Sequence, residues 1–310
     1  MPKAEPDFTL ADREDRLAWI LGSSRSGSTW LLRMLSELQQ VVAIDDPHIG
    51  HHLGVWRPIP LAWATAEEMP GLTTLWTVKR GKQSYFFSDR YRDEWAPALR
   101  QLIVTRFDAQ ANDVAGTRGV REPTVLVKEP GSHVADLLFS LFPESRLIFL
   151  VRDGRDVVDS WIDAYTHGSW ALDEGAYPLA AEGRLPMVRW LSTVWTYRIA
   201  VVQAAYERGV GSARMMVRYE DLLHDPVAQL GGVCDTLELD VPRSRLEAIA
   251  EEQSFERVSA AEKGGGKEVR AARPGGWRVN LSAEEQKVML EIMGEKLAEL
   301  RYIRGATVPA

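Results

Sequence analysis

The stretch that decides the fold is Trp19-Ile-Leu-Gly-Ser-Ser-Arg-Ser-Gly-Ser-Thr-Trp-Leu-Leu-Arg33. Its apolar start predicts a buried strand, its small residues a tight loop, and its end a helix that begins near Ser28 or Thr29. Gly22 and Gly27 let the N–H groups of the loop converge on an anion. The helix adds the positive end of its dipole. The stretch therefore predicts a cradle for a phosphate group.

The cation of this loop is in an unusual place. The spacing Gly22-x4-Gly27 copies the start of the loop that binds nucleoside triphosphates, which continues with Lys and then Ser or Thr. Here Ser28 stands where that loop requires Lys, and the cation is Arg25, inside the loop. We therefore expect Arg25 to contact an anionic group that lies over the loop itself.

A second strand and helix, over residues 146–161, carry groups suited to another phosphate. The run Leu-Ile-Phe-Leu-Val predicts a buried parallel strand, and Arg152 follows at its exit. Asp153 can cap the next helix. Ser160 comes eight residues after Arg152, which is about two turns at roughly 3.6 residues per turn. An Arg and a Ser on one edge of this helix could bind a second phosphate.

Together these segments resemble the 5′-phosphosulfate and 3′-phosphate loops of sulfotransferases, the enzymes that use 3′-phosphoadenosine 5′-phosphosulfate (PAPS). The Arg-Ser-Gly-Ser-Thr sequence is shared with bacterial members. The resemblance implies an α/β fold of the three-layer P-loop NTPase type, with a central parallel sheet flanked by helices. It assigns PAPS binding in these two segments to Arg25, Ser26, Gly27, Ser28, Thr29, Trp30, Arg152 and Ser160.

Two further segments extend the resemblance over most of the chain. Tyr219 opens a Tyr-Glu-Asp-Leu turn in which the family's Tyr contacts the adenine. The sequence Arg-Ala-Ala-Arg-Pro-Gly-Gly-Trp-Arg at 270–278 is similar to the loop that closes over the 3′-phosphate. Either arginine of this loop could bind it, and the residues implied are Arg270, Arg273, Gly275, Gly276 and Trp277.

Each feature alone has an ordinary structural explanation. A glycine-rich turn is often only a tight turn, and a lone Arg, Ser or Tyr is commonly a surface, helix or core residue. Their order along the chain favours one nucleotide site instead, because each follows a predicted strand and an open α/β sheet binds its ligands at the strand ends.

The predicted reaction is in-line transfer of the sulfuryl group, which needs fixed donors for the charge that develops on the leaving phosphate. Better studied cytosolic enzymes of the family have Lys where Arg25 stands. Arg keeps its proton near neutral pH, so we expect Arg25 to stabilise charge rather than to donate a proton. The resemblance implies no metal.

The general base is harder to assign. The cytosolic enzymes use the His of a Lys-Thr-His motif, but the corresponding segment here reads Lys128-Glu-Pro130. Glu129 is the nearest proton acceptor. The segment 45–52 holds three of the six histidines, and imidazole suits a base at neutral pH. We expect His51 first, then His48 and Glu129, with Lys128 at the bridging oxygen or the acceptor. A solvated loop or a chance metal-binding cluster is the alternative.

Composition favours one soluble domain over residues 1–310, with 1–16 frayed. Residues 44–120 and 168–186 break the helix and strand pattern, and we expect them to form the walls and lid of the acceptor site. Several of the 11 tryptophans lie in or beside these walls: Trp56, Trp63, Trp76, Trp161 and Trp170.

The balance of charges and the cysteine count set further limits. A formal charge of −7 argues against a nucleic-acid partner. No apolar stretch approaches the roughly 20 residues that span a bilayer. Cys234 is the only cysteine, which excludes an internal disulfide and favours a cytoplasmic protein.

The pattern predicts strands over 17–21, 124–127, 146–151 and 214–217, and helices over 29–39, 133–142, 156–165, 187–207 and 283–300. The expected acceptor is a hydroxyl or amine of a small molecule, a carbohydrate or a lipid-like compound, including a carrier-bound β-hydroxyacyl chain whose sulfation precedes elimination. Two alternatives are a P-loop small-molecule kinase and a catalytically silent nucleotide-binding protein of the same fold. The sequence does not set the oligomeric state.

Overall fold

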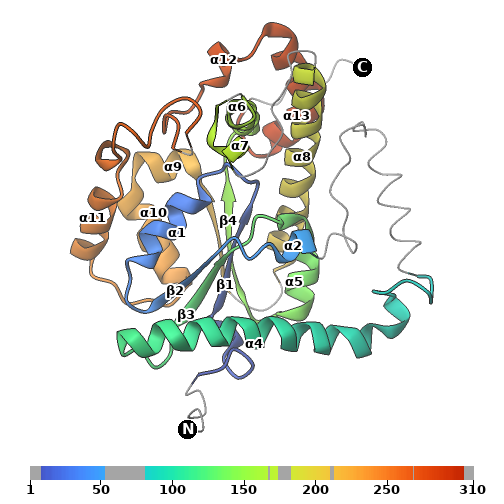
Figure 1. Ribbon diagram of the computed structural model, residues 1–310, viewed down its shortest axis with the longest axis vertical. Coiled ribbons are helices and arrows are strands. Elements are labelled where there is room, and N and C mark those ends of the chain that lie inside the picture. The colour runs from blue at the N-terminus through green and yellow to red at the C-terminus, as the bar shows by residue number, and fades with distance from the viewer. Residues whose placement is uncertain are drawn as a thin grey trace.

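The computed structural model describes residues 8–52, 81–166, 168–173, 183–209, 213–267 and 269–303. Their strands form one parallel sheet in the order β2-β3-β1-β4-β5 (Figure 1). The strands are β1 Leu17–Gly22, β2 Val41–Asp45, β3 Thr124–Lys128, β4 Arg146–Val151 and β5 Arg214–Arg218. The chain leaves β1 first toward β2 and β3 on one side and later toward β4 and β5 on the other. Ligands of such sheets bind where these connections diverge, beyond the carboxyl end of β1.

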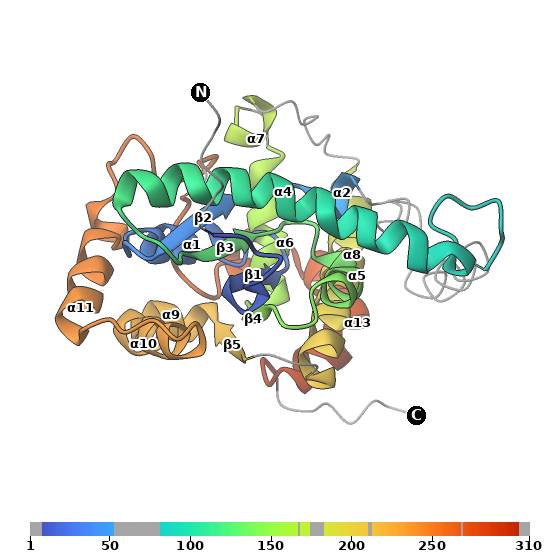
Figure 2. The same cartoon turned by 90° about the horizontal axis from the view of Figure 1, so that it is seen from below.

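Helices cover both faces of the sheet (Figure 2). Alternate residues of β1 point to opposite faces, Trp19 and Leu21 into one core cluster and Ala18 and Ile20 into the other. The first cluster includes α5 Ala135–Leu141, α6 Gly154–Ala164, α8 Arg184–Arg208 and α13 Ala283–Glu299. The second includes α1 Ser28–Ser36, α9 Tyr219–His224, α10 Pro226–Thr236 and α11 Arg243–Glu252. The expected three-layer α/β fold is confirmed.

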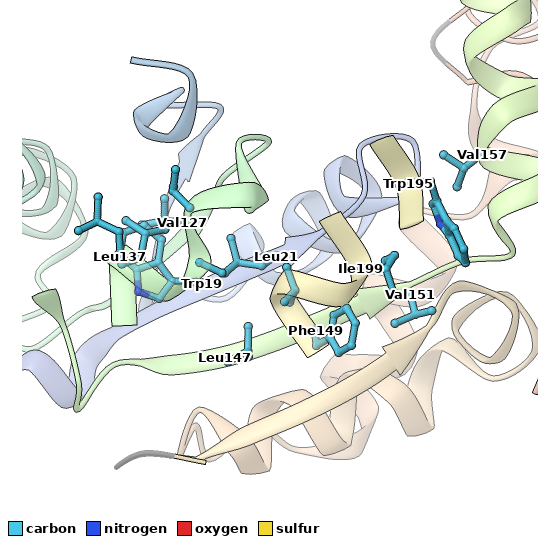
Figure 3. Close-up of a cluster of buried hydrophobic side chains, with 14 of the residues drawn as sticks. Trp19, Leu21, Val127, Leu137, Leu147, Phe149, Val151, Val157, Trp195 and Ile199 are labelled. Atoms are coloured by element: carbon cyan, nitrogen blue, oxygen red, sulfur yellow. The ribbon is translucent and has the colours of Figure 1, made fainter. Parts of the chain in front are cut away.

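The first core cluster fixes α8 against the sheet (Figure 3). Trp195 and Ile199 of α8 are almost fully buried; Ile199 lies near Phe149 and Val151 of β4, and Trp195 lies near Val157 of α6. A side chain on Gly154, the first residue of α6, would meet the Trp195 ring at 2.6 Å. The absence of a side chain there lets α8 approach the start of α6 closely. The contact therefore fixes this part of α8 next to the start of α6, which follows the carboxyl end of β4.

The expectation that residues 44–120 are irregular is wrong for α4 Arg92–Arg118, a helix of 27 residues. β2, a fifth strand that was not expected, ends inside this segment at Asp45. The buried residues Ile103, Val104, Phe107 and Ala111 of α4 belong to the core, so this helix is not a wall or lid of the site. Figure 1 shows α4 across the end of the sheet opposite α6 and α7. Its apolar face is narrow and interrupted by charged residues, which obscured the helical period in the sequence.

The expectation that the N-terminus is frayed is wrong for residues 8–16. Phe8 and Leu10 are buried in the core, and the Leu10 N–H donates to Asp108 of α4 over 2.9 Å. Residues 1–7 lie outside the described residues. The sequence of the N-terminus gave no sign of this contact, because Asp108 lies 98 residues after Leu10.

The remaining elements are short: α2 Ile49–His52, α7 Trp170–Asp173, α12 Trp277–Asn280, and the 3₁₀ turns Glu14–Arg16, Asp89–Tyr91, Ser132–Val134 and Phe255–Arg257. The segment 168–186, expected to be irregular, contains α7 and the start of α8, and residues 174–182 are not described. Within the described ranges, no helix is long and apolar enough to cross a membrane.

Candidate active site

The loop between β1 and α1 has two residues in the left-handed region. Gly27 caps α1 in the left-handed region, at φ 89°. Arg25 also has a positive φ, 68°, a conformation that costs a non-glycine residue free energy and is often retained at functional sites. A side chain on Gly27 would meet the Tyr219 ring at 2.5 Å. Glycine is therefore required at this position both for its backbone conformation and for its close contact with Tyr219, the first residue of α9.

The Arg25 side chain reaches the second predicted phosphate segment. Its Nε donates to the Ser160 hydroxyl of α6 over 3.2 Å. The guanidinium lies 5.0 Å from the centre of the Trp170 ring and 6.0 Å from that of Trp161. Arg152 Nη1 donates to the Arg25 carbonyl over 2.8 Å. The two segments predicted to bind the two ends of one nucleotide are therefore in direct contact.

Tyr219 completes this cluster from the end of β5. The Arg152 guanidinium lies 4.4 Å from the centre of its ring, and Trp30 packs edge-on at 6.3 Å. The Trp30 indole donates to the Gln253 carbonyl over 2.7 Å. Burial raises the pKa of Tyr219, against the opposing effect of Arg152, so the hydroxyl stays protonated. Two aromatic rings and an arginine thus form one wall that could bind a purine.

Two buried carboxylates of α6 hold the loop at 269–277. Asp159 forms an ion pair with Arg270 and accepts from the Asn280 amide over 3.0 Å. Asp156 accepts from the Gly275 N–H over 2.7 Å and more weakly from the Trp277 N–H. Burial raises the pKa of Asp156, although the Gly275 N–H opposes this. The loop is therefore tied to the same helix that carries Ser160.

One cavity, the nucleotide-side cavity, collects most of the predicted PAPS-binding residues. Those that line it are Arg25, Gly27, Ser28, Thr29, Trp30, Arg152, Ser160, Tyr219, Arg270 and Arg273. Gly275, Gly276 and Trp277 do not line it but form the turn that Asp156 holds. Ser26 is fully buried and does not line it either.

A second cavity, the acceptor-side cavity, adjoins the first. Arg25, Ser28, Thr29 and Arg33 line both, so the loop lies between them. Lys128, Glu129 and His48 line the second cavity only. Its other wall consists of aromatic and apolar residues, among them Trp161, Tyr165, Trp170, Trp190, Leu191 and Val194. Trp56, Trp63 and Trp76 lie outside the described residues.

Lys128 connects the acceptor-side cavity to the loop. It is almost fully buried at the end of β3, and its ammonium donates to the Thr29 hydroxyl over 3.0 Å. The same nitrogen lies 2.6 Å from a carboxylate oxygen of Asp45 and 2.9 Å from one of Asp46, both at the end of β2. Since β2 was not anticipated, these two partners of Lys128 were not anticipated either.

The three candidate bases lie in different surroundings. Glu129 is 2% exposed, and its oxygens accept from the N–H groups of Ile49, over 2.8 Å, and Gly131, over 2.6 Å. Burial raises its pKa against these two hydrogen bonds. His48 is exposed in the acceptor-side cavity. The backbone of His51 belongs to α2, while its side chain lies outside the described residues.

Sequence reasoning missed Arg198 of α8, which is 7% exposed and lines the acceptor-side cavity. Its Nη1 donates to the Ser24 hydroxyl over 3.0 Å. The available signal was its position in an otherwise apolar helix face, seven residues after Leu191. Arg33, which lines both cavities one turn into α1, was missed as well. In the described part of the chain, no three His, Cys, Asp or Glu side chains gather as metal ligands would.

Several solved structures are similar to this chain. A sulfotransferase from Mycobacterium avium is 16% identical, with a TM-score of 0.52 over 94% of this chain and 80% of that one, and it shares the fold. The sulfotransferase domain of the Synechococcus olefin synthase is 18% identical, with a TM-score of 0.46 over 89% and 93%. A mouse sulfotransferase complexed with PAP is 11% identical, with a TM-score of 0.49 over 91% and 85%.

Among proteins with curated descriptions, none matches this chain. The model of the Sulfotransferase family, in contrast, matches residues 18–243, which include β1 from Ala18 on, the loop after it and the other four strands. Because this match spans more than half of the 310 residues, the chain belongs to the sulfotransferase family.

Proposed function

We propose that this sulfotransferase takes the sulfuryl group from PAPS and passes it to a hydroxyl or amine of a small-molecule, carbohydrate or lipid-like acceptor, releasing adenosine 3′,5′-bisphosphate (PAP). The observation that carries the proposal is the shared cavity. Arg25, Arg152, Ser160, Tyr219 and Arg270 come from four separate segments and line one space. An anion with two charged ends and a purine matches that set of groups.

Buried donors without partners support an anionic ligand. In the described part of the chain, the Ser26 hydroxyl and Arg152 Nε are buried and have no hydrogen-bond partner. An unsatisfied buried polar group costs free energy, so such groups in a native protein call for an explanation. Both lie in the segments that would bind the two ends of PAPS, and small adjustments on binding would let them donate to its oxygens.

The roles follow from position. The backbone of residues 24–29, with the Ser28 and Thr29 hydroxyls, would hold the 5′-phosphosulfate, and Arg152, Ser160 and Arg270 or Arg273 the 3′-phosphate. Bound PAPS supplies an activated sulfuryl group. Arg25 lies between the two cavities, so its guanidinium would neutralise charge on the leaving oxygen. Preorganised donors of this kind contribute roughly 3 to 4 kcal/mol each.

For the base we propose a histidine of α2 or the turn before it, His51 ahead of His48. Glu129 is less suited, because each of its oxygens already accepts a backbone N–H and holds the turn beside α2. Imidazole is the side chain best suited to accept a proton near neutral pH. A base chosen from this turn would face the acceptor rather than the nucleotide.

The kinase alternative is disfavoured by the surroundings of Thr29. In the triphosphate-binding loop, the hydroxyl at this position binds Mg²⁺. Here the Thr29 hydroxyl accepts from the Lys128 ammonium over 3.0 Å, and Asp45 and Asp46 pair with the same ammonium. The hydroxyl and the nearest carboxylates therefore already share a cation supplied by the protein.

The test is transfer of ³⁵S-sulfate from labelled PAPS to a panel of hydroxyl and amine acceptors, with Arg25→Ala as the control. We expect at least one labelled product from the wild type and about 100-fold less from the variant. PAP binding without transfer to any acceptor would favour the catalytically silent alternative. Absence of PAP binding would remove the proposal altogether.

A further inference from the structure

Arg198 differs from the other buried arginines in lacking an acidic partner. Arg146 pairs with Glu238 at 2.9 Å, and Arg155 pairs with Asp153 at 2.7 Å. Within the described ranges, no carboxylate lies within ion-pair distance of Arg198. Its only hydrogen bond there goes to the Ser24 hydroxyl. Its Nε is buried without a partner.

This arrangement is costly for folding. A buried cation loses the solvation it would have in water, and that loss is recovered only when an opposite charge is near. Burial lowers the pKa of Arg198 to about 10, more than the nearby Glu129 and Tyr165 raise it. At neutral pH the guanidinium is still charged. The fold therefore keeps a positive charge beside the loop after β1 that Glu129, which forms no ion pair with it, offsets only in part.

The charge faces the acceptor-side cavity beside an apolar surface. Leu191, Val194 and Arg198 follow one another at intervals of three and four residues on α8, so they lie on one face of the helix. All three line the acceptor-side cavity, and none lines the nucleotide-side cavity. Close packing of Trp195 on Gly154 holds this part of α8 in place. The cavity thus offers an apolar strip that ends in a fixed cation.

We propose that Arg198 binds a carboxylate or phosphate group of the acceptor, so that the natural acceptor is an anionic compound with an apolar segment beside the charge. This inference rests on the proposed function. Arg198 is a specificity-determining residue in this account. Its planar guanidinium presents parallel N–H groups that match either anion, while Nη1 stays bonded to Ser24.

The test uses three probes of equal chain length: hexanoate, hexyl phosphate and the neutral hexanamide. Each is titrated calorimetrically into the wild type, Arg198→Gln and the matched control Arg189→Gln, whose side chain is exposed on the same helix. Titrations are run with and without saturating PAP. We expect the wild type and Arg189→Gln to bind at least one anion at least tenfold more tightly than hexanamide, and Arg198→Gln to lose that preference.

The outcomes separate the possible explanations. Tighter binding of hexanoate identifies a carboxylate acceptor, and tighter binding of hexyl phosphate identifies a phosphate. No preference for either anion in the wild type, or a preference that survives in Arg198→Gln, overturns the proposal. A lower kcat in Arg198→Gln with an unchanged anion preference also overturns it, because the residue would then act on the sulfuryl group. Failure of the wild type to bind PAP would instead count against the proposed function.

Thermal unfolding distinguishes a structural role of Arg198 from a role in binding the acceptor. If Arg198 were only structural, Arg198→Gln would lower the Tm. Under our proposal the variant loses a buried charge without an acidic partner, so its Tm stays level or rises. A large fall in Tm together with an unchanged anion preference would contradict the proposal.

Discussion

The two cavities are built in different ways. The nucleotide-side cavity is formed where strands end: Arg25 follows β1, Arg152 follows β4 and Tyr219 follows β5. The acceptor-side cavity also meets strand ends, at Asp45 of β2 and Lys128 of β3, but much of its other wall comes from helix α8, through Leu191, Val194 and Arg198. The comparison indicates that strand ends position most of the predicted nucleotide-binding residues, while a helix supplies much of the predicted acceptor side. Substitutions in the two cavities should therefore have separable effects.

The largest effect is expected at the boundary between the cavities. Arg25→Ala should lower kcat about 100- to 1000-fold, because it removes a preorganised charge at the leaving oxygen. Arg25→Lys should retain more activity, since it keeps the charge but loses the bond from Nε to Ser160. Steady-state rates of ³⁵S-sulfate transfer measure both. Equal rates for the two variants would show that the charge of Arg25 is not what matters.

Arg270 and Arg273 test the part of the nucleotide-side cavity formed by the loop at 269–277. Arg270→Ala leaves Asp159 buried without its cation, and we expect a loss of about 3 kcal/mol in the free energy of unfolding together with weaker PAP binding. Arg273 is exposed, so Arg273→Ala should change the stability little. Urea unfolding and PAP calorimetry on both variants check this. The difference would disappear if Asp159 did not hold Arg270.

Arg152 lines only the nucleotide-side cavity and Glu129 only the acceptor-side cavity, so substitutions at these two residues compare the cavities most clearly. Arg152→Ala should weaken PAP binding by about 10- to 100-fold, the effect of losing hydrogen bonds to a charged group. Glu129→Ala should leave PAP affinity within about twofold, because Glu129 does not line the nucleotide-side cavity. Calorimetric titration of PAP measures both. Similar losses of affinity in the two variants would mean that the cavities do not act separately.

The smallest effect concerns pH. Burial raises the pKa of Glu129 in the folded protein, so the folded state takes up a proton before the unfolded state does as the pH falls. The resulting stabilisation is lost as pH rises through the raised pKa and is complete below the ordinary carboxyl pKa of about 4.3. The stability of the wild type relative to Glu129→Gln should therefore increase from pH 8 to pH 5.

Chemical unfolding at several pH values tests this trend. Glu256→Gln, which alters an exposed carboxylate, is the matched control for the substitution itself. A stability difference between the wild type and Glu129→Gln that shrinks as the pH falls would contradict the assigned direction.

The sequence allowed the nucleotide-side residues to be predicted because local pattern encodes them. A glycine-rich turn after an apolar run, or an Arg directly after a strand, has its place in the sheet as soon as the strand is recognised. The strands over residues 17–22, 124–128, 146–151 and 214–218 were all anticipated to within a residue. The α/β fold followed from them.

The acceptor side could not be predicted in the same way. β2 is only five residues long, and the helical spacing of Ile103, Phe107, Ala111 and Ala115 in α4 was not recognised among its polar neighbours. The partners of Lys128 and Arg198 lie 82 and 174 residues away, so no local pattern joins them. Segment 53–80, expected to form part of the lid, lies outside the described residues, and its role remains a prediction.

The central claim is that one cavity binds a doubly phosphorylated adenosine through Arg25 and Arg152. Calorimetric titration of PAP without metal, and of ATP with Mg²⁺, tests it most directly. The account predicts one-to-one binding of PAP at least tenfold tighter than that of ATP, with the preference reduced in Arg152→Ala. Tighter binding of ATP with Mg²⁺, or a PAP affinity unchanged by that substitution, would contradict it.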